Sequence, residues 1–250
     1  MRSLLVSDAE WGVRCDLAAL YRLAALQKYD DVLLTHISAR VPGPHRHFLI
    51  NAFGSRFCEI TASSLVKIDL EGNVVGQNTQ RFNYAGFVIH SAIHAARDDA
   101  HFIIHFHTDD GVAVASQKEG VMPLNQRALG VLKRLAYHDY EGVATSLGER
   151  ERIVADLGEK SLMILRNHGT LALGPTAGHA WMGMYNLEKT CTTQIKALSA
   201  GRANLLMVPD EVQQQAAARV MNSVRRDESM ALAWQALLRQ VEQDSPGFNE

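Results

Sequence analysis

The chain has 250 residues, of which 47% are apolar, and a formal net charge of −2. Such a chain can bury one full hydrophobic core, and no stretch has the composition of a long linker, so we expect a single domain over residues 1–250. The dispersed basic residues exclude the electrostatic footprint of a nucleic-acid-binding protein. Because no apolar run could span a bilayer and the start does not read as a signal peptide, we expect a cytoplasmic protein without membrane contact.

The first part of the chain changes from a helical to a strand pattern. Residues 7–10 have the form of a capping box, and apolar residues then recur at helical spacing up to residue 24, which predicts a first helix. Residues 32–70 contain short apolar runs separated by turn residues, which is typical of several strands. The next helix is predicted at 87–97, and it is joined tightly to a strand at 100–108.

The second part of the chain predicts a hairpin followed by helices. Two strands are expected at 163–165 and 171–174, and they meet at residues 167–170. This arrangement places His168 near a hairpin tip or a strand end, where functional residues often lie. Helical patterns follow at 176–198 and at 210–241.

His105 and His107 form a His-x-His pair inside the predicted strand 100–108. Successive side chains alternate between the two faces of a sheet, so both imidazoles lie on one face, about 6.5–7 Å apart along the strand. Two ring nitrogens can then converge on one metal ion at roughly 2.0–2.2 Å each, and a third histidine from another hairpin could complete the set. On the local pattern alone, a partly buried pair that hydrogen-bonds to the backbone is the more common alternative.

Several segments occur in the order that is typical of one family, and together they cover nearly the whole chain: 36–42, 60–73, 90–108 and 136–142. The chain resembles the class II aldolase and adducin family, and the last two segments are similar to its adducin-like branch. The resemblance implies an α/β fold, a single three-layer α/β/α domain around a largely antiparallel central sheet, commonly assembled as a homotetramer. It also implies His105, His107 and His168 as ligands of a divalent metal, most often zinc, with Fe²⁺ or Mn²⁺ as other candidates.

The departures from the family pattern concern catalysis and phosphate binding. Where the sugar-phosphate aldolases of the family have Ser-Ser-Glu, this chain has Tyr84, Ala85 and Gly86. Glycine cannot replace the carboxylate in general-base work that typically contributes ~10²–10⁴-fold. The family's Gly-Asn entry corresponds to Thr35 and His36, and its Thr-Pro-Ser-Gly loop to residues 51–54. An ordinary sugar-phosphate aldolase or epimerase is therefore disfavoured.

The donor set predicts the substrate class. Three neutral imidazoles leave the charge of a dication uncompensated and leave coordination positions open, which favours a small anionic chelator such as a 2-oxo or 2-hydroxy acid. We expect a metal-dependent lyase that polarises a carbonyl and breaks the neighbouring C–C bond by aldol-type cleavage or decarboxylation of a non-phosphorylated substrate. The alternatives are a non-haem Fe(II) oxygenase that cleaves a 2-oxo or 2-hydroxy acid side chain, and a non-catalytic adducin-like binding protein. The candidates for substrate binding are Asn51, Gly54 and Arg81, with Arg56 and Arg127 as other cations that could hold a second anionic group.

Because the family's carboxylate is missing, several residues are candidates for the group that transfers the proton. The candidate catalytic residues are Tyr140, His90 and Tyr137, followed by His138 and Asp109. His90 occupies a helix position where the family repeatedly has histidine, and its alternative role is to orient a metal ligand. His94 lies one turn further on the same helix face, where the pair could form a second metal site.

Overall fold

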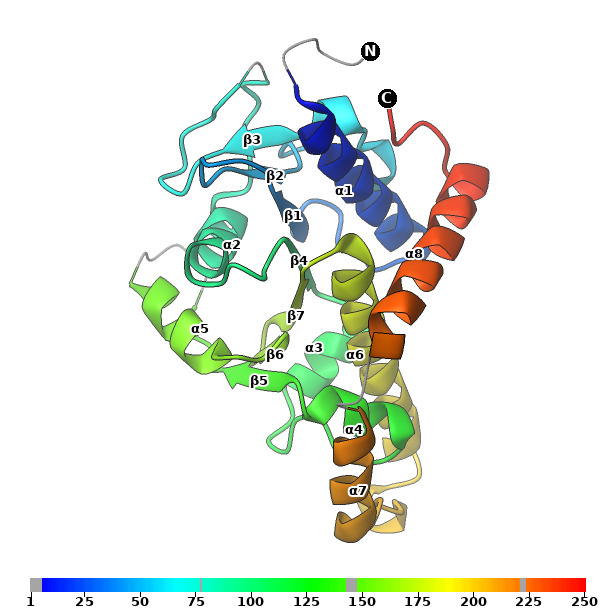
Figure 1. The fold of residues 1–250 in the computed structure, drawn as a ribbon. Coiled ribbons are helices and arrows are strands. Elements are labelled where there is room, and N and C mark those ends of the chain that lie inside the picture. Colours follow the sequence, from blue (N-terminus) through cyan, green and yellow to red (C-terminus); the bar gives the residue numbers. More distant parts are fainter. Residues whose placement is uncertain (1–5, 77, 143–147, 221–223) are drawn as a thin grey trace.

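The computed structural model describes residues 6–76, 78–142, 148–220 and 224–250. Within these ranges, the side chains of residues 216–220 and 224–226 are not described. One seven-stranded sheet runs through the middle of the molecule, with strand order β3-β2-β1-β4-β7-β6-β5 (Figure 1). All neighbouring strands are antiparallel except β5 and β6, which confirms the expected largely antiparallel sheet. The strands are β1 (His36–Arg40), β2 (Phe48–Ile50), β3 (Val66–Ile68), β4 (Phe102–Phe106), β5 (Leu135–His138), β6 (Leu162–Leu165) and β7 (Gly169–Gly174).

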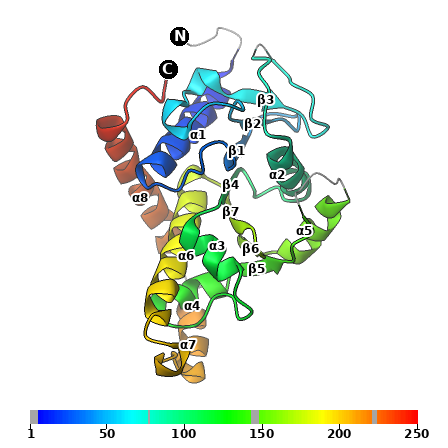
Figure 2. The ribbon, with the colours of Figure 1, turned by 180° about the vertical axis from the view of Figure 1, so that it is seen from behind.

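Helices cover both faces of this sheet. The α-helices are α1 (Asp8–Leu26), α2 (Tyr84–Ala96), α3 (Asp109–Ala115), α4 (Gln126–Leu132), α5 (Glu149–Leu157), α6 (Ala177–Leu198), α7 (Asp210–Val220) and α8 (Val224–Asp244), and short 3₁₀ turns lie at Phe57–Glu59, Ala62–Ser64 and Arg202–Asn204. Helices α1 and α6 pack on one face with α8 outside them, and α2 and α5 pack on the other, as the view from behind also shows (Figure 2). The three-layer α/β/α architecture is thus confirmed.

The C-terminal region is helical on both sides of residues 221–223, which lie outside the described residues, so the expectation of one helix at 210–241 stays a prediction there. The two helical segments are α7 and α8. Helix α7 packs against α4, whereas α8 packs against α1 and α6. The two helices therefore lie against different parts of the molecule.

The strands divide the apolar side chains between two cores because successive residues alternate between the faces of the sheet. On β4, Ile104 lies in the core beneath α1 and α6, whereas Ile103 lies in the core beneath α2 and α5. On β1, Ile37 and Ala39 face the α1 side. The remaining residues of both strands therefore point toward α2, and they include the polar side chains described below. None of the helices in the described residues is long and apolar enough to cross a membrane.

Candidate metal centre

Polar side chains from β1 and β4 gather on the face of the sheet that α2 covers. The register pairs His36 with His105, and Ser38 with Ile103. Because Ile104 and Phe106 belong to the core on the opposite face, His105 and, two residues on, His107 project to the α2 side. The site therefore follows from the period-two pattern and from the antiparallel register.

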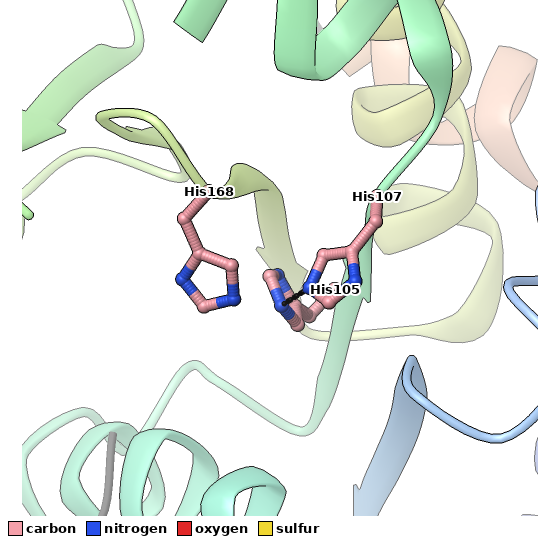
Figure 3. Close-up of side chains that lie close together, drawn as sticks. All are labelled: His105, His107 and His168. Atoms are coloured by element: carbon pink, nitrogen blue, oxygen red, sulfur yellow. Dashed lines mark hydrogen bonds between the residues drawn. The ribbon is translucent and has the colours of Figure 1, made fainter. Parts of the chain in front are cut away.

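His105, His107 and His168 come together at this face, and one ring nitrogen of each lies within 4.8 Å of those of the other two. Figure 3 shows that His105 and His107 extend from β4 and its C-terminal end, while His168 reaches in from the turn between β6 and β7. The Nε2 atoms of His105 and His107 are 2.9 Å apart. Asn167, directly before His168, has a left-handed backbone with φ of 54°, which asparagine tolerates better than most residues and which turns the chain toward the cluster.

The outer nitrogens of two of these rings are held by acceptors. His105 Nδ1 donates to the Thr170 carbonyl oxygen at 2.9 Å, and His107 Nδ1 donates to the Asp31 carboxylate at 3.1 Å. A neutral imidazole carries one N–H, so both Nε2 atoms present lone pairs to each other. Two lone pairs at 2.9 Å repel, and a cation between them removes the repulsion. The donor set therefore fits a divalent metal ion bound by three imidazoles, and the carbonyl and carboxylate are partners of the kind that orient such ligands.

Burial keeps these imidazoles neutral, as metal ligands must be. Burial, followed by the neighbouring His168, His36 and His107 rings, holds the pKa of His105 well below its ordinary value. The pKa of His168 is lowered to about 4, first by burial and then by His107 and His138. Two imidazoles are thus ready to bind a cation at neutral pH without first losing a proton.

A buried carboxyl supports the ligand strands from the α6 side. Glu188, which is 1% exposed, accepts hydrogen bonds from the hydroxyls of Thr108 and Thr170. Thr108 follows His107, and the carbonyl of Thr170 holds His105. Glu188 therefore connects the backbone around two ligands, and burial raises the pKa of its carboxyl.

His36 occupies the space beside the first turn of α2. Its ring centroid is 5.0 Å from that of His105. A β-carbon at residue 86 would lie 2.5 Å from Cδ2 and 2.8 Å from Nε2 of His36, so the helix approaches this closely only because residue 86 is glycine. The imidazole and a side chain at residue 86 exclude each other, which explains physically why the chain has a glycine here.

The candidate catalytic residues lie in different environments. The Tyr140 ring is half exposed, at 55%, and its centroid is 6.4 Å from that of His168. Tyr137 lies on the other face of β5, where its hydroxyl accepts a hydrogen bond from the Val121 backbone and its ring packs under Arg166. His90 is fully buried on α2 and is hydrogen-bonded to His36, which separates it from the cluster. Only Tyr140 of these three is both near the cluster and open to solvent.

Residues expected to bind substrate are arranged around one loop. The carbonyl of Arg81 accepts a hydrogen bond from the Phe53 backbone at 2.7 Å, which holds Arg81 beside Asn51 and Gly54. The Asn51 side chain is itself buried and accepts a hydrogen bond from the Tyr21 hydroxyl at 2.9 Å. The Asn51 amide therefore contributes to the core in this structure, whereas Gly54 and Arg81 are exposed, and Arg81 is the charged one of the two. Of the other cations, Arg127 stacks on Tyr185 of α6.

His138 lines a small cavity beside His168, together with Tyr140 and Glu149. Its Nδ1 pairs with Asp156 at 2.7 Å, while its buried Nε2 has no hydrogen-bond partner in the described part of the chain, and the nearest Glu149 oxygen is 3.5 Å away. The cavity volume is about 10 Å³, which is room for about one water. His138 is therefore a neighbour of the cluster whose Nε2 lies near Glu149 but makes no hydrogen bond among the described residues.

Sequence reasoning missed Asp31, Glu188 and Ser38. Asp31 stands in an irregular segment before β1, and Glu188 lies within the long helix α6. Neither belongs to a motif, and both reach the site through contacts across more than seventy residues of sequence. The sequence carries no local signal for such pairs.

The sequence matches the family model described as "Class II Aldolase and Adducin N-terminal domain" over residues 15–195. A Caulobacter vibrioides protein whose name assigns it to the class 2 aldolases is 56% identical over 97% of this chain and 94% of its own length. Rat alpha-adducin is 42% identical over 83% of this chain, and the matched part is 29% of that longer protein.

Solved structures agree with these matches. An aldolase II superfamily protein from Pseudomonas syringae superposes with a TM-score of 0.93, at 51% identity and 98% coverage of both chains. An L-fuculose 1-phosphate aldolase from Glaciozyma antarctica superposes with a TM-score of 0.81, at 26% identity over 98% of this chain and 96% of that one.

Proposed function

This chain belongs to the class II aldolase and adducin family, and on that premise we propose that it is a divalent-metal-dependent lyase for a small, non-phosphorylated 2-oxo or 2-hydroxy acid. The observation that carries the proposal is the pair of facing Nε2 lone pairs on His105 and His107, completed by His168. We assign these residues as the metal ligands and zinc as the metal, with Fe²⁺ or Mn²⁺ as the other candidates. A bound divalent metal would polarise a carbonyl or carboxylate of the substrate and so favour cleavage of the adjacent C–C bond.

The chain's own residues supply binding and orientation. Asp31 and Thr170 fix two imidazoles so that their Nε2 atoms face each other at the proposed metal position. Arg81 is the assigned partner for an anionic group of the substrate, because it is exposed at the loop formed by residues 51–54. Tyr140 is the assigned proton-moving residue, since its hydroxyl-bearing ring lies next to His168 and is open to solvent.

The absence of a carboxylate at residue 86 directs the proposal away from sugar-phosphate cleavage. The His36 ring fills the space that a side chain there would need. A substrate whose cleavage requires a strong carboxylate base at this position is therefore a poor fit. A 2-oxo acid with a second carboxylate on the carbon next to its carbonyl can lose carbon dioxide without prior removal of a proton, and the resulting enolate then takes up one proton.

Metal content tests the assignment. Protein purified without added metal and without oxygen should contain about one divalent metal per chain, and a variant with His105→Ala, His107→Ala and His168→Ala should contain none. His45→Ala, at an exposed histidine between β1 and β2, is a matched control that should retain the metal. A triple histidine variant that keeps the full metal content would refute the ligand assignment.

A substrate screen tests the reaction class. We expect loss of a 2-oxo or 2-hydroxy acid without consumption of dioxygen, inhibition by oxalate, and a homotetramer by light scattering. Dioxygen consumption with bound iron would instead establish an oxygenase.

A non-catalytic binding protein is the second candidate, and the 42% identity to rat alpha-adducin favours it. Stoichiometric metal without turnover of any acid in the screen, together with no binding of oxalate, would support this candidate over the lyase.

A further inference from the structure

Four buried side chains form a continuous hydrogen-bonded chain behind the metal ligands. His36 Nδ1 lies 2.9 Å from His90 Nε2, and His90 Nδ1 lies 2.5 Å from Ser38 Oγ. Ser38 Oγ is also 2.8 Å from His94 Nε2, and His94 Nδ1 is 3.0 Å from the carbonyl oxygen of Ala100. All four side chains are at most 2% exposed.

The far end of this chain fixes the direction of every hydrogen bond in it. The Ala100 carbonyl can only accept, so His94 Nδ1 carries the proton and its Nε2 is an acceptor. Ser38 must then donate its single hydroxyl proton to His94, and it can only accept from His90 Nδ1. His90 Nε2 is consequently an acceptor for His36 Nδ1. Each imidazole is held in the Nδ1-H tautomer.

These tautomers require neutral rings, and the surroundings of the rings keep them neutral. Burial lowers the pKa of His90 well below the ordinary value. The pKa of His94 falls to about 3, through burial and the nearby Arg40 guanidinium. Among the described residues, no carboxylate is a hydrogen-bond partner of these rings, so no negative charge in direct contact offsets the cost of burying an imidazolium.

The end of this hydrogen-bonded chain that lies nearest to the metal ligands is a nitrogen that accepts no hydrogen bond. With Nδ1 protonated, His36 Nε2 carries a lone pair, and within the described ranges no residue hydrogen-bonds to it. This nitrogen faces the first turn of α2 over Gly86, and the ring lies 5.0 Å from that of His105. A lone pair with a fixed direction is thus presented next to the three-histidine cluster.

We propose that His36 Nε2 accepts a hydrogen bond from a substrate hydroxyl on the carbon next to the metal-bound group, so that it is a specificity-determining residue of this site. This inference rests on the proposed function and narrows its substrate class to acids that carry such a hydroxyl. A phosphate or carboxylate at that carbon offers only lone pairs to Nε2 and is rejected. The tautomer lock means that the ring cannot turn its N–H toward an anion without breaking the bonds through His90 and Ser38.

The tautomers are measured directly on the whole protein. In ¹⁵N-histidine-labelled protein, two-bond ¹H–¹⁵N correlation spectra distinguish the Nδ1-H from the Nε2-H form. We expect His36, His90 and His94 all in the Nδ1-H form at neutral pH. An Nε2-H tautomer at His36, in protein with or without added Zn²⁺, would overturn the proposal.

Ligand binding tests the selectivity. The probes are glycerate, which has a hydroxyl at the required carbon, lactate, which lacks it, 3-phosphoglycerate, which replaces it with a phosphate, and oxalate, which tests chelation alone. With zinc-loaded protein in calorimetry, glycerate should bind about threefold to tenfold more tightly than lactate, the value expected for one neutral hydrogen bond. 3-Phosphoglycerate should bind no more tightly than lactate.

Two variants and a control locate the effect. His36→Phe should abolish the preference for glycerate while leaving oxalate affinity unchanged. Ser38→Ala, which breaks the lock without touching the ligand, should reduce the preference and mix the tautomers of His36. Ser91→Ala removes another buried hydroxyl, which serves the Phe87 carbonyl instead, and should change neither.

The outcomes separate this inference from the function on which it rests. If oxalate does not bind zinc-loaded wild-type protein, the proposed function fails. If oxalate binds but glycerate and lactate bind equally in wild type, only the role of His36 is refuted. Should His36→Phe fail to fold, the tautomer spectra and Ser38→Ala decide the question.

Discussion

Replacing Gly86 with alanine should destabilise the protein, against the usual benefit of alanine in a helix. The new β-carbon would lie 2.5 Å from Cδ2 of His36, about 1 Å closer than an ordinary carbon contact. The ring cannot move aside freely, because it is buried and hydrogen-bonded to His90. Overpacking costs about 1–3 kcal/mol, and a contact this short with a fixed ring belongs to the upper part of that range, about 2–3 kcal/mol. The helix propensity of alanine returns up to about 1 kcal/mol. The net loss should be about 1–2 kcal/mol.

Thermal unfolding at one protein concentration measures this loss. For a chain of this size the expected decrease in Tm is about 2–8 °C. Gly12→Ala is the matched control, since Gly12 lies in α1 and no atom lies within 4 Å of the place its new methyl group would take, so its Tm should rise. A rise for Gly86→Ala comparable to that of Gly12→Ala would refute the close packing of His36 on α2. In a His36→Ala background, Gly86→Ala should behave like the control, and an unchanged loss there would mean that another contact is responsible.

Three further predictions follow from the hydrogen bonds of the site. Asp31→Asn should weaken metal affinity about 10–100-fold in chelator competition because it loosens His107, whereas Asp30→Asn beside it should not, and equal losses would contradict the orienting role. Burial raises the pKa of the Glu188 carboxyl, so its contribution to the stability of wild type is complete below the unfolded pKa of about 4.5 and is lost as pH rises through the folded pKa. The Glu188→Gln variant should therefore gain stability relative to wild type as pH rises above about 5. A difference in Tm between the two proteins that does not vary with pH would contradict this. The pKa of His94 is about 3 in the folded protein and 6.5 in the unfolded chain, so the stabilisation of the protein by neutral His94 is complete above pH 6.5 and is lost toward pH 3. Between these pH values, His94→Gln should reduce the slope of the unfolding free energy against pH by about 1.4 kcal/mol per pH unit. A slope equal to that of wild type would contradict this prediction.

The parts of the site that sequence could predict are those governed by local geometry. The alternation of a strand places His105 and His107 on one face, and the turn between two apolar runs places His168 at the tip of β6 and β7. The same alternation places Tyr137 and His138 of β5 on opposite faces of the sheet. The strand pattern alone therefore predicts that Tyr137 points away from the cluster if His138 points toward it.

The parts that could not be predicted depend on contacts between distant segments. Asp31 reaches His107 only because the segment before β1 passes the end of β4, and His36 meets His90 only because α2 packs across β1.

The three histidines are not equally anchored, and this difference has a kinetic consequence. His105 lies on β4, the middle strand of the sheet, whose amides are shielded by β1 and β7, whereas His168 lies on a turn that follows the left-handed Asn167. Local opening of a turn requires less free energy than opening of a central strand. Metal exchange should therefore proceed through brief excursions of the 166–168 turn while a two-histidine half-site stays formed, and hydrogen exchange should be slow along β4 even in protein that has lost its ion.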